Sequence, residues 1–238
     1  MKHLKNISFC IFLFIFAVFP LWSQEIQTAF SYFDQMSTQY GSVEDYEADI
    51  VITTSSGEME GVLYYKSPNL LRINFTKPAD QVLVVDGEKL VLYIPELRVV
   101  MEQQLKKRSA ANVASMASSQ GLNLMKKRYS ISYLGEQGSI PVPLDPPGTS
   151  SAGSSLEPVV KLKLEWRSTD EGFRQIELSV DDKTKLIRRI VGISGEYERI
   201  QIDFIRIKTN TGIPAGRFRY ESPNTANVYN NFLFEPEE

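Results

Sequence analysis

The sequence predicts a mainly β fold with helices, an α+β protein built on one antiparallel sheet that is strongly curved or forms an open barrel. About ten segments are rich in β-branched, aromatic and other apolar residues, and short turns containing Gly, Pro, Asn or Asp join them. Two other segments have the three-to-four residue spacing of a helix. A barrel of this size can enclose more space than its side chains fill. We therefore expect either an apolar cavity or a fully packed interior.

The first 23 residues are predicted to be a secretory signal peptide. Two lysines precede an almost uninterrupted apolar run from Ile7 to Trp22, and Ser23 stands where cleavage is expected. An uncleaved membrane anchor is the alternative, but the run of about 16 residues is shorter than the roughly 20 that span a bilayer. We expect export to the periplasm, with cleavage near Ser23.

Cleavage would change the composition in a way that excludes several classes of function. It would remove His3 and Cys10, the single histidine and the single cysteine. The usual bases, nucleophiles and soft metal ligands would then be missing, so we expect no metal and no cofactor. It would also remove two of the 26 basic residues and none of the 29 acidic ones, leaving a net charge near −5. An acidic chain without a long basic run argues against a nucleic-acid binder.

The first predicted element is an amphipathic helix over residues 24–40. Apolar residues recur there at steps of three and four, and Gly41 follows where a helix would end. These apolar residues are Ile26, Phe30, Phe33, Met36 and Tyr40. A helix of this kind needs no function beyond covering a core.

Six strand signals follow within about sixty residues, which describes an antiparallel meander. They span residues 46–54, 61–66, 70–75, 81–85, 89–94 and 98–103. The Asp86-Gly87 pair predicts a tight hairpin between the fourth and fifth strands. Both of these strands are apolar on both faces, whereas a surface hairpin leaves one face polar. A second layer or a cavity must therefore meet the second face.

After these strands the sequence pattern changes from that of strands to that of a helix. Residues 109–127 are rich in Ala and are interrupted by Gly121. We predict a helix over residues 109–119, which is either ordinary packing or a mobile lid that carries Met116. Residues 135–155 are dominated by Gly, Pro and Ser and are predicted to be a flexible loop. The remaining strands are predicted at residues 129–134, 159–166, 173–180, 186–193 and 199–208, which completes a single domain over residues 24–238.

One region resembles a known family. Residues 61–96 contain, in order, Gly61 and Leu63, the run PNLLR from Pro68 to Arg72, Pro78, the Asp86-Gly87 turn, and Tyr93 with Pro95. Behind a signal peptide and a first helix, this ordered set is similar to the signature region of the LolA-type periplasmic lipoprotein carriers. The similarity covers most of the mature chain, although residues 128–238 match only in pattern and in the closing segment 218–223.

The resemblance implies an unclosed β-barrel, or half-barrel, with a helical lid over an apolar cavity, and it implies binding without catalysis. Members of this family take up the acyl chains of lipoproteins released from the inner membrane and pass them to an outer-membrane acceptor. The implied partners are acylated lipoproteins, an inner-membrane lipoprotein-releasing transporter and that acceptor. Membrane contact would be transient, and the protein would be a monomer.

Alternation along the strands then predicts which side chains line the cavity, although a slip of one residue would reverse the face. The predicted acyl-binding residues are Ile50, Ile52, Leu63, Leu71, Ile73, Phe75, Leu90 and Leu92, with Met116 reaching from the lid.

Two positions depart from the family pattern. Ser67 stands where members commonly carry an arginine that ties the lid to the barrel, and Val91 stands where they often carry an aromatic residue. Lid locking by that arginine therefore does not carry over. Arg72 or Lys66 can substitute for it, with a solvated surface charge as the alternative role for both. We assign Ser67 and Arg72 as candidate lid or switch residues.

Three other classes of function are weighed against the carrier. A related half-barrel module can bind another lipid or sense envelope stress or lipoproteins. A membrane-anchored acceptor is disfavoured, because Cys10 follows Phe9 and not the small residue of a lipidation site. A carboxylate-dependent hydrolase would need two carboxyl groups about 5 to 9 Å apart across a cleft. The adjacent pairs Glu58 with Glu60 and Asp181 with Asp182 are the candidates, although such acids usually occupy exposed turns.

Overall fold

The computed structural model describes residues 27–105, 117–136, 138–145, 158–167 and 173–231. The predicted signal peptide, most of the predicted helix at 109–119, and Met116 lie outside these residues. None of the described helices is long and apolar enough to cross a membrane.

Within the described residues, thirteen strands form one sheet, and every pairing is antiparallel except the parallel pair β13 and β6. The order is β13-β6-β5-β4-β3-β2-β1-β12-β11-β10-β9-β7, with β8 paired to β9. Their bounds are β1 Asp45–Thr54, β2 Gly57–Lys66, β3 Leu70–Lys77, β4 Val82–Val85, β5 Lys89–Ile94, β6 Val99–Gln104, β7 Tyr129–Tyr133, β8 Val142–Pro143, β9 Pro158–Trp166, β10 Phe173–Asp181, β11 Ile187–Ser194, β12 Arg199–Thr209 and β13 Asn227–Asn230.

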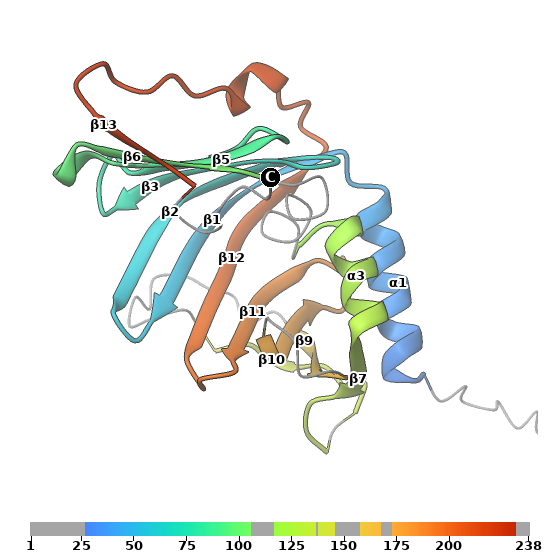
Figure 1. Cartoon of the computed structure of the whole chain (residues 1–238). Coiled ribbons are helices and arrows are strands. Elements are labelled where there is room, and N and C mark those ends of the chain that lie inside the picture. Colours follow the sequence, from blue (N-terminus) through green and yellow to red (C-terminus); the bar gives the residue numbers. More distant parts are fainter. Residues whose placement is uncertain (1–26, 106–116, 137, 146–157, 168–172, 232–238) are drawn as a thin grey trace, which may run out of the picture.

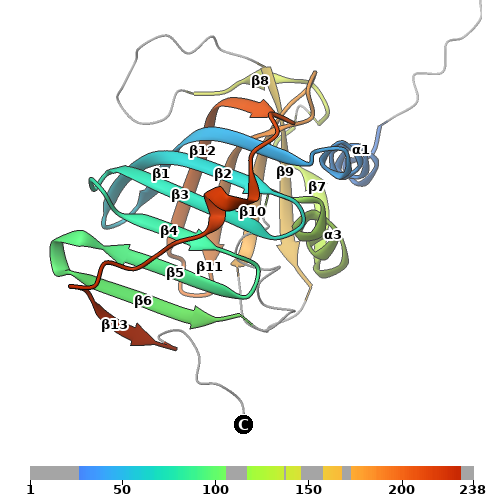
Figure 2. The same ribbon diagram turned by 90° about the horizontal axis from the view of Figure 1, so that it is seen from above.

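The sheet bends into a half-barrel and does not close, because β13 and β7 are its two ends. Figure 1 shows β2 to β6 across the top and β10 to β12 curving away beneath them. Two helices, α1 (Ala29–Gly41) and α3 (Ser119–Arg128), pack side by side against one end of this curve (Figures 1 and 2). The predicted mainly β fold with a large unclosed curved sheet is confirmed.

Helix α1 begins later than the sequence pattern predicted. Gln27 and Thr28 are not helical, and the Thr28 side chain accepts a hydrogen bond from the backbone N–H of Ser31 at 3.1 Å. This N-cap satisfies a free donor of the first turn and fixes the start at Ala29, so the prediction was wrong for Gln27 and Thr28, and residues 24–26 lie outside the described residues. The buried face includes Phe33 and Met36, both fully inaccessible to solvent.

Helix α3 lies where the sequence pattern indicated an interruption. Ala117 and Ser118 precede the helix, and the Ser118 hydroxyl accepts from the backbone N–H of Gly121 at 3.2 Å. Gly121 is therefore inside the first turn and does not break the helix. Burial of Leu122 and Met125 on the core side outweighs the poor helix propensity of glycine, which costs about 1 kcal/mol.

Two strands were not predicted. Strand β8 falls inside the predicted loop at 135–155, where Val142 and Pro143 pair with β9. Strand β13 is exposed along its whole length and pairs in parallel with the edge strand β6. Neither strand has a buried face, so neither has the apolar alternation from which strands are predicted.

The main core lies on the concave side of the sheet, where α1 packs against the strands. The second face of the β4–β5 hairpin is also buried, because Val84 and Val91 are only 1% and 3% exposed. These two residues do not belong to the main core cluster. Residues 213–230, hereafter the C-terminal segment, cross that outer face (Figure 2). Phe218 within it is buried, and Tyr220 lies with its ring 6.2 Å from that of Tyr93 on β5. The C-terminal segment thus covers the second apolar face.

Candidate functional site

An apolar cavity of about 180 Å³ lies on the concave side of the sheet. Strands from both arms of the half-barrel contribute to its wall, together with one residue that precedes α3. The lining residues are Tyr46, Ile50, Ile52, Leu63, Leu71, Ile73, Leu83, Val85, Ala117, Ile190, Ile202 and Phe204. Among them, Tyr46 alone has a polar atom in its side chain, so the wall offers almost nothing but hydrocarbon.

Strand register brings these side chains together. Leu63, Ile73 and Leu83 are direct partners across β2, β3 and β4, so their side chains form one row on one face. On the other arm, Ile52 is paired with Ile202 across β1 and β12, and Ile202 is paired with Ile190 of β11. Because side chains alternate along a strand, each row belongs wholly to the concave face.

The structure places the predicted acyl-binding residues in two groups. Ile50, Ile52, Leu63, Leu71 and Ile73 line the cavity. The other three described residues are close to it in the fold but do not line it: Phe75 and Leu90 are buried in the same core cluster, and Leu92 packs against that cluster. Met116 lies outside the described residues.

Seven lining residues were missed by the sequence analysis. Tyr46 shares β1 with the predicted Ile50 and Ile52, so its alternation was available as a signal. Leu83 and Val85 lie on β4, opposite the predicted Ile73 and Leu71 of β3. Ile190, Ile202 and Phe204 come from β11 and β12, which reach the cavity only because β12 pairs with β1. No local pattern predicts a pairing between residues some 150 positions apart. Ala117 is placed by the entry into α3.

A cluster of three hydroxyl groups connects β2 to the start of α3. Tyr65 is 3% exposed, and hydrogen bonds from the side chains of Ser118 and Ser67 reach its hydroxyl. Burial raises the pKa of Tyr65, and the two serine bonds lower it by a smaller amount. The Tyr65 hydroxyl also donates to the carbonyl of Pro68 at 3.2 Å. Ser67 is thereby connected through Tyr65 to Ser118, the N-cap of α3.

Two cations proposed as substitutes for the family arginine contact the C-terminal segment and not α3. Arg72 donates to the carbonyl oxygens of Arg217 and Arg219 at 3.0 and 3.3 Å. The Nζ of Lys66 donates to the carbonyl of Ile213 at 2.8 Å. Strand alternation explains why Arg72 contacts the C-terminal segment and not α3: Leu71 faces the cavity, so the next residue, Arg72, faces the outer side of the sheet.

Asp45 fixes the turn from which the C-terminal segment begins. Its buried carboxylate accepts from the backbone N–H groups of Thr211, Gly212 and Ile213 at 2.7, 3.1 and 3.0 Å. Burial acts to raise the pKa of Asp45, but the hydrogen bonds from Thr211 and Ile213, together with the charge of Lys66, hold it below its ordinary value. The ionised carboxylate is thus a structural group.

The carboxylate pairs considered for catalysis are occupied by other contacts. Glu58 and Glu60 lie 3.3 and 3.7 Å from the Nζ of Lys77. Asp181 accepts from the backbone of the turn that follows it, and Asp182 is paired with Lys185 at 2.8 Å. None of these acids lines the apolar cavity. The described residues contain no cluster of three or more potential metal ligands.

Comparison with known proteins shows a similarity to one family. The model of the family described as "Outer membrane lipoprotein carrier protein LolA" matches residues 42–157. The match covers just under half of the chain, and over that part the protein is similar to this family. Two outer-membrane lipoprotein carrier proteins are among the proteins with a similar sequence. That of Methylibium petroleiphilum is 25% identical over 175 residues, which is 74% of this chain and 72% of the relative. That of Pseudomonas aeruginosa is 26% identical over 171 residues, covering 72% and 71%.

Solved structures support the same fold. An uncharacterised conserved protein from Thermus thermophilus superposes with a TM-score of 0.52 at 15% identity, covering 84% of this chain and 96% of that one. The Pseudomonas aeruginosa MucA/MucB complex contains a chain that superposes with a TM-score of 0.50 at 12% identity, covering 84% and 63%. At these identities the likeness concerns the fold alone.

Proposed function

We propose that this LolA-type protein is a carrier that holds the acyl chains of lipoproteins in its concave cavity and moves them from the inner to the outer membrane. The observation that supports this most is a wall of twelve side chains with a single polar member, in a chain related to lipoprotein carriers. Burial in such a wall stabilises an acyl chain by about 0.8 kcal/mol per CH₂ group. That gain is what a lipid anchor needs in order to cross water.

Uptake requires the cavity to enlarge. Its volume of about 180 Å³ is below the roughly 300 to 1,000 Å³ of sites that enclose drug-sized ligands. Cargo therefore binds a more open state, and release is favoured when the protein closes again. The contact between Ser118, Tyr65 and Ser67 lies beside Ala117 in the wall, so it is the described contact best placed to control this opening.

The route implies where the protein works and what it meets. We propose a periplasmic location after removal of residues 1–23, with residues 24–238 acting as one monomeric domain. The donor would be an inner-membrane lipoprotein-releasing transporter and the recipient an outer-membrane acceptor, with transient membrane contact. No catalytic step is needed, because the acyl chain only moves from one apolar environment, the membrane, to another, the cavity.

Native mass spectrometry of the protein purified from its own cell envelope tests the cargo. A bound polypeptide carrying acyl chains is the expected result. Bound phospholipid or glycolipid would instead favour a related lipid carrier, and protein without any acyl ligand would contradict the carrier role. The variant Ile52→Phe, which fills the cavity, serves as the control and should carry less cargo than the wild type.

A further inference from the structure

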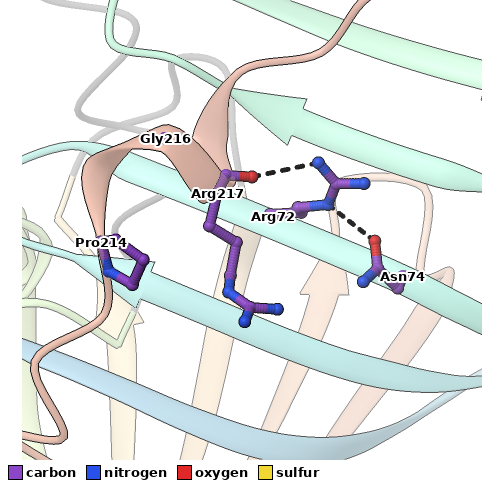
Figure 3. Close-up of a pocket in the computed structure, with 5 residues that line it drawn as sticks. All are labelled: Arg72, Asn74, Pro214, Gly216 and Arg217. Atoms are coloured by element: carbon purple, nitrogen blue, oxygen red, sulfur yellow. Dashed lines mark hydrogen bonds between the residues drawn. The ribbon is translucent and has the colours of Figure 1, made fainter.

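A second, polar groove of about 360 Å³ lies on the outer face of the sheet, opposite the concave cavity. It is lined by Arg72 and Asn74 of β3 and by Pro214, Gly216 and Arg217 of the C-terminal segment. Figure 3 shows Arg72 between Arg217 and Asn74, with its guanidinium held against the segment. None of these five residues lines the apolar cavity.

Hydrogen bonds within the wall engage four acceptor oxygens of the groove. The Oδ1 atom of Asn74 accepts from Nε of Arg72 at 2.7 Å. The carbonyl of Pro214 accepts from the backbone N–H of Arg217 at 3.0 Å, and the carbonyl of Gly216 accepts from that of Arg219 at 3.2 Å. The carbonyl of Arg217 accepts from Nη1 of Arg72. Each of these oxygens thus already accepts one hydrogen bond, whereas several donors of the wall have no partner among the described residues.

Two positive charges lie in this wall without a negative partner among the described residues. No carboxylate of the described residues lies within 4 Å of the guanidinium of Arg72 or Arg217, and no described group accepts a hydrogen bond from the Arg217 side chain. The Arg217 guanidinium stacks on the ring of Tyr64, 4.3 Å from its centroid. Burial, and then the neighbouring charge of Arg217, lower the pKa of Arg72. The two positive charges therefore repel each other, and a bound anion would relieve this repulsion.

We propose that this groove, hereafter the outer groove, binds a phosphate group. The open donors are Nη2 of Arg72, the amide nitrogen of Asn74 and the guanidinium of Arg217, which match the several acceptor oxygens of a phosphate better than the two of a carboxylate. Arg72 is already fixed by three hydrogen bonds, so little side-chain freedom is lost on binding. The phosphate comes either from a soluble phosphate ester or from a lipid headgroup at a membrane surface.

The chain provides a matched pair of variants for the test. Arg217→Gln removes one charge and the stacking contact but keeps the carbonyl that holds Arg72. Arg174→Gln removes the same charge and an equivalent contact, because Arg174 stacks on Tyr197 at 4.3 Å on another part of the surface. Loss of a charge-assisted hydrogen-bonding partner should weaken binding about tenfold or more.

Inorganic phosphate is titrated into the mature protein and both variants by calorimetry. We expect binding by the wild type and by Arg174→Gln, and binding at least about tenfold weaker by Arg217→Gln. Equal affinities of all three proteins would overturn the proposal, as would the absence of phosphate binding. Binding of polyglutamate in preference to phosphate would overturn it too, and would point to an acidic partner protein.

Flotation with phosphatidylcholine vesicles, with and without phosphatidic acid, distinguishes the two sources of phosphate. Capture by phosphatidic acid that Arg217→Gln abolishes supports a lipid headgroup, whereas phosphate binding without vesicle capture supports a soluble ester. Uptake of a fluorescent fatty acid should be the same in both variants and the wild type. Failure of the outer groove is thus distinguishable from failure of the acyl-binding cavity.

Discussion

At the scale of single residues, the outer face of the sheet depends on Asp45. This carboxylate accepts from three consecutive backbone N–H groups and lies 3.8 Å from the Nζ of Lys66, which itself holds the carbonyl of Ile213. One buried side chain thus fixes the turn that leads the C-terminal segment over Val84 and Val91. Without that cover, the hairpin would expose its second apolar face.

Replacing Asp45 with Asn should reduce the free energy of unfolding by about 2 to 4 kcal/mol, because an amide cannot accept from all the backbone donors that are then left buried. The control is Asp49→Asn, because Asp49 lies on the same strand as Asp45 but forms a surface ion pair with Arg206 of β12. This substitution should lower the free energy of unfolding by no more than about 1 kcal/mol. Urea unfolding measures both. Equal effects of the two variants would contradict the role given to Asp45.

Stability should also depend on pH through Asp45. Its pKa is lower in the folded protein than its ordinary value near 3.9, so the folded state gains stability above that value and loses it as the pH falls through the folded pKa. Urea titrations between about pH 2 and 6 should show a steeper loss below pH 4 for the wild type than for Asp45→Asn. Parallel profiles would mean that other carboxyl groups dominate acid unfolding.

At the scale of elements, the junction of β2 with α3 is the place where the cavity wall meets a helix. Tyr65 supplies the hydroxyl, and Ser67 and Ser118 bond to it from the two sides. Neutral hydrogen bonds contribute about 0.5 to 1.5 kcal/mol each, which is less than the roughly 1.5 to 3 kcal/mol of bonds to a charged group. This junction should therefore open more easily than one held by an arginine.

Two variants test the junction in opposite directions. Tyr65→Phe removes the shared hydroxyl and should speed the transfer of bound cargo to acceptor liposomes. Ser67→Arg adds donors and a charge and should slow transfer while leaving uptake possible. Tyr129→Phe is the control, because its hydroxyl bonds to the carbonyl of Phe173 away from this junction. If timed transfer is the same for all four proteins, the junction does not control the cavity.

At the scale of the whole molecule, the positions of the strands could be predicted from the sequence better than the pairing of one strand with another. Strands β1 to β6 have β-rich apolar runs joined by short turns, and their observed bounds lie within about four residues of the predicted ones. The half of the cavity wall that comes from β11 and β12 depends on the long-range pairing of β12 with β1, which no periodicity contains. Helix α3 and strand β13 were missed because tertiary contacts, and not local propensity, determine them. The outer groove has the same origin, since its two arginines are 145 residues apart in the chain.

The compartment is a prediction at this scale as well. If residues 1–23 are removed on export, the mature protein should appear in the periplasmic fraction of a two-membrane cell without detergent, and its first residue should be Gln24. Fractionation followed by intact-mass analysis checks both points. Recovery only with detergent, or a mass that includes Met1, would show that the apolar N-terminus is retained as an anchor.

The central claim is that the concave cavity accepts acyl chains, and a pair of neighbouring substitutions on β1 tests it most directly. Ile52 lines the cavity, whereas Val51 is the next residue and faces the other side of the sheet. The protein, Ile52→Phe and Val51→Phe are titrated with a fluorescent fatty acid after circular dichroism has shown that all three are folded. We predict saturable binding by the wild type and Val51→Phe, and binding at least about tenfold weaker by Ile52→Phe. Equal binding by the two variants, or no binding by the wild type, would contradict the account.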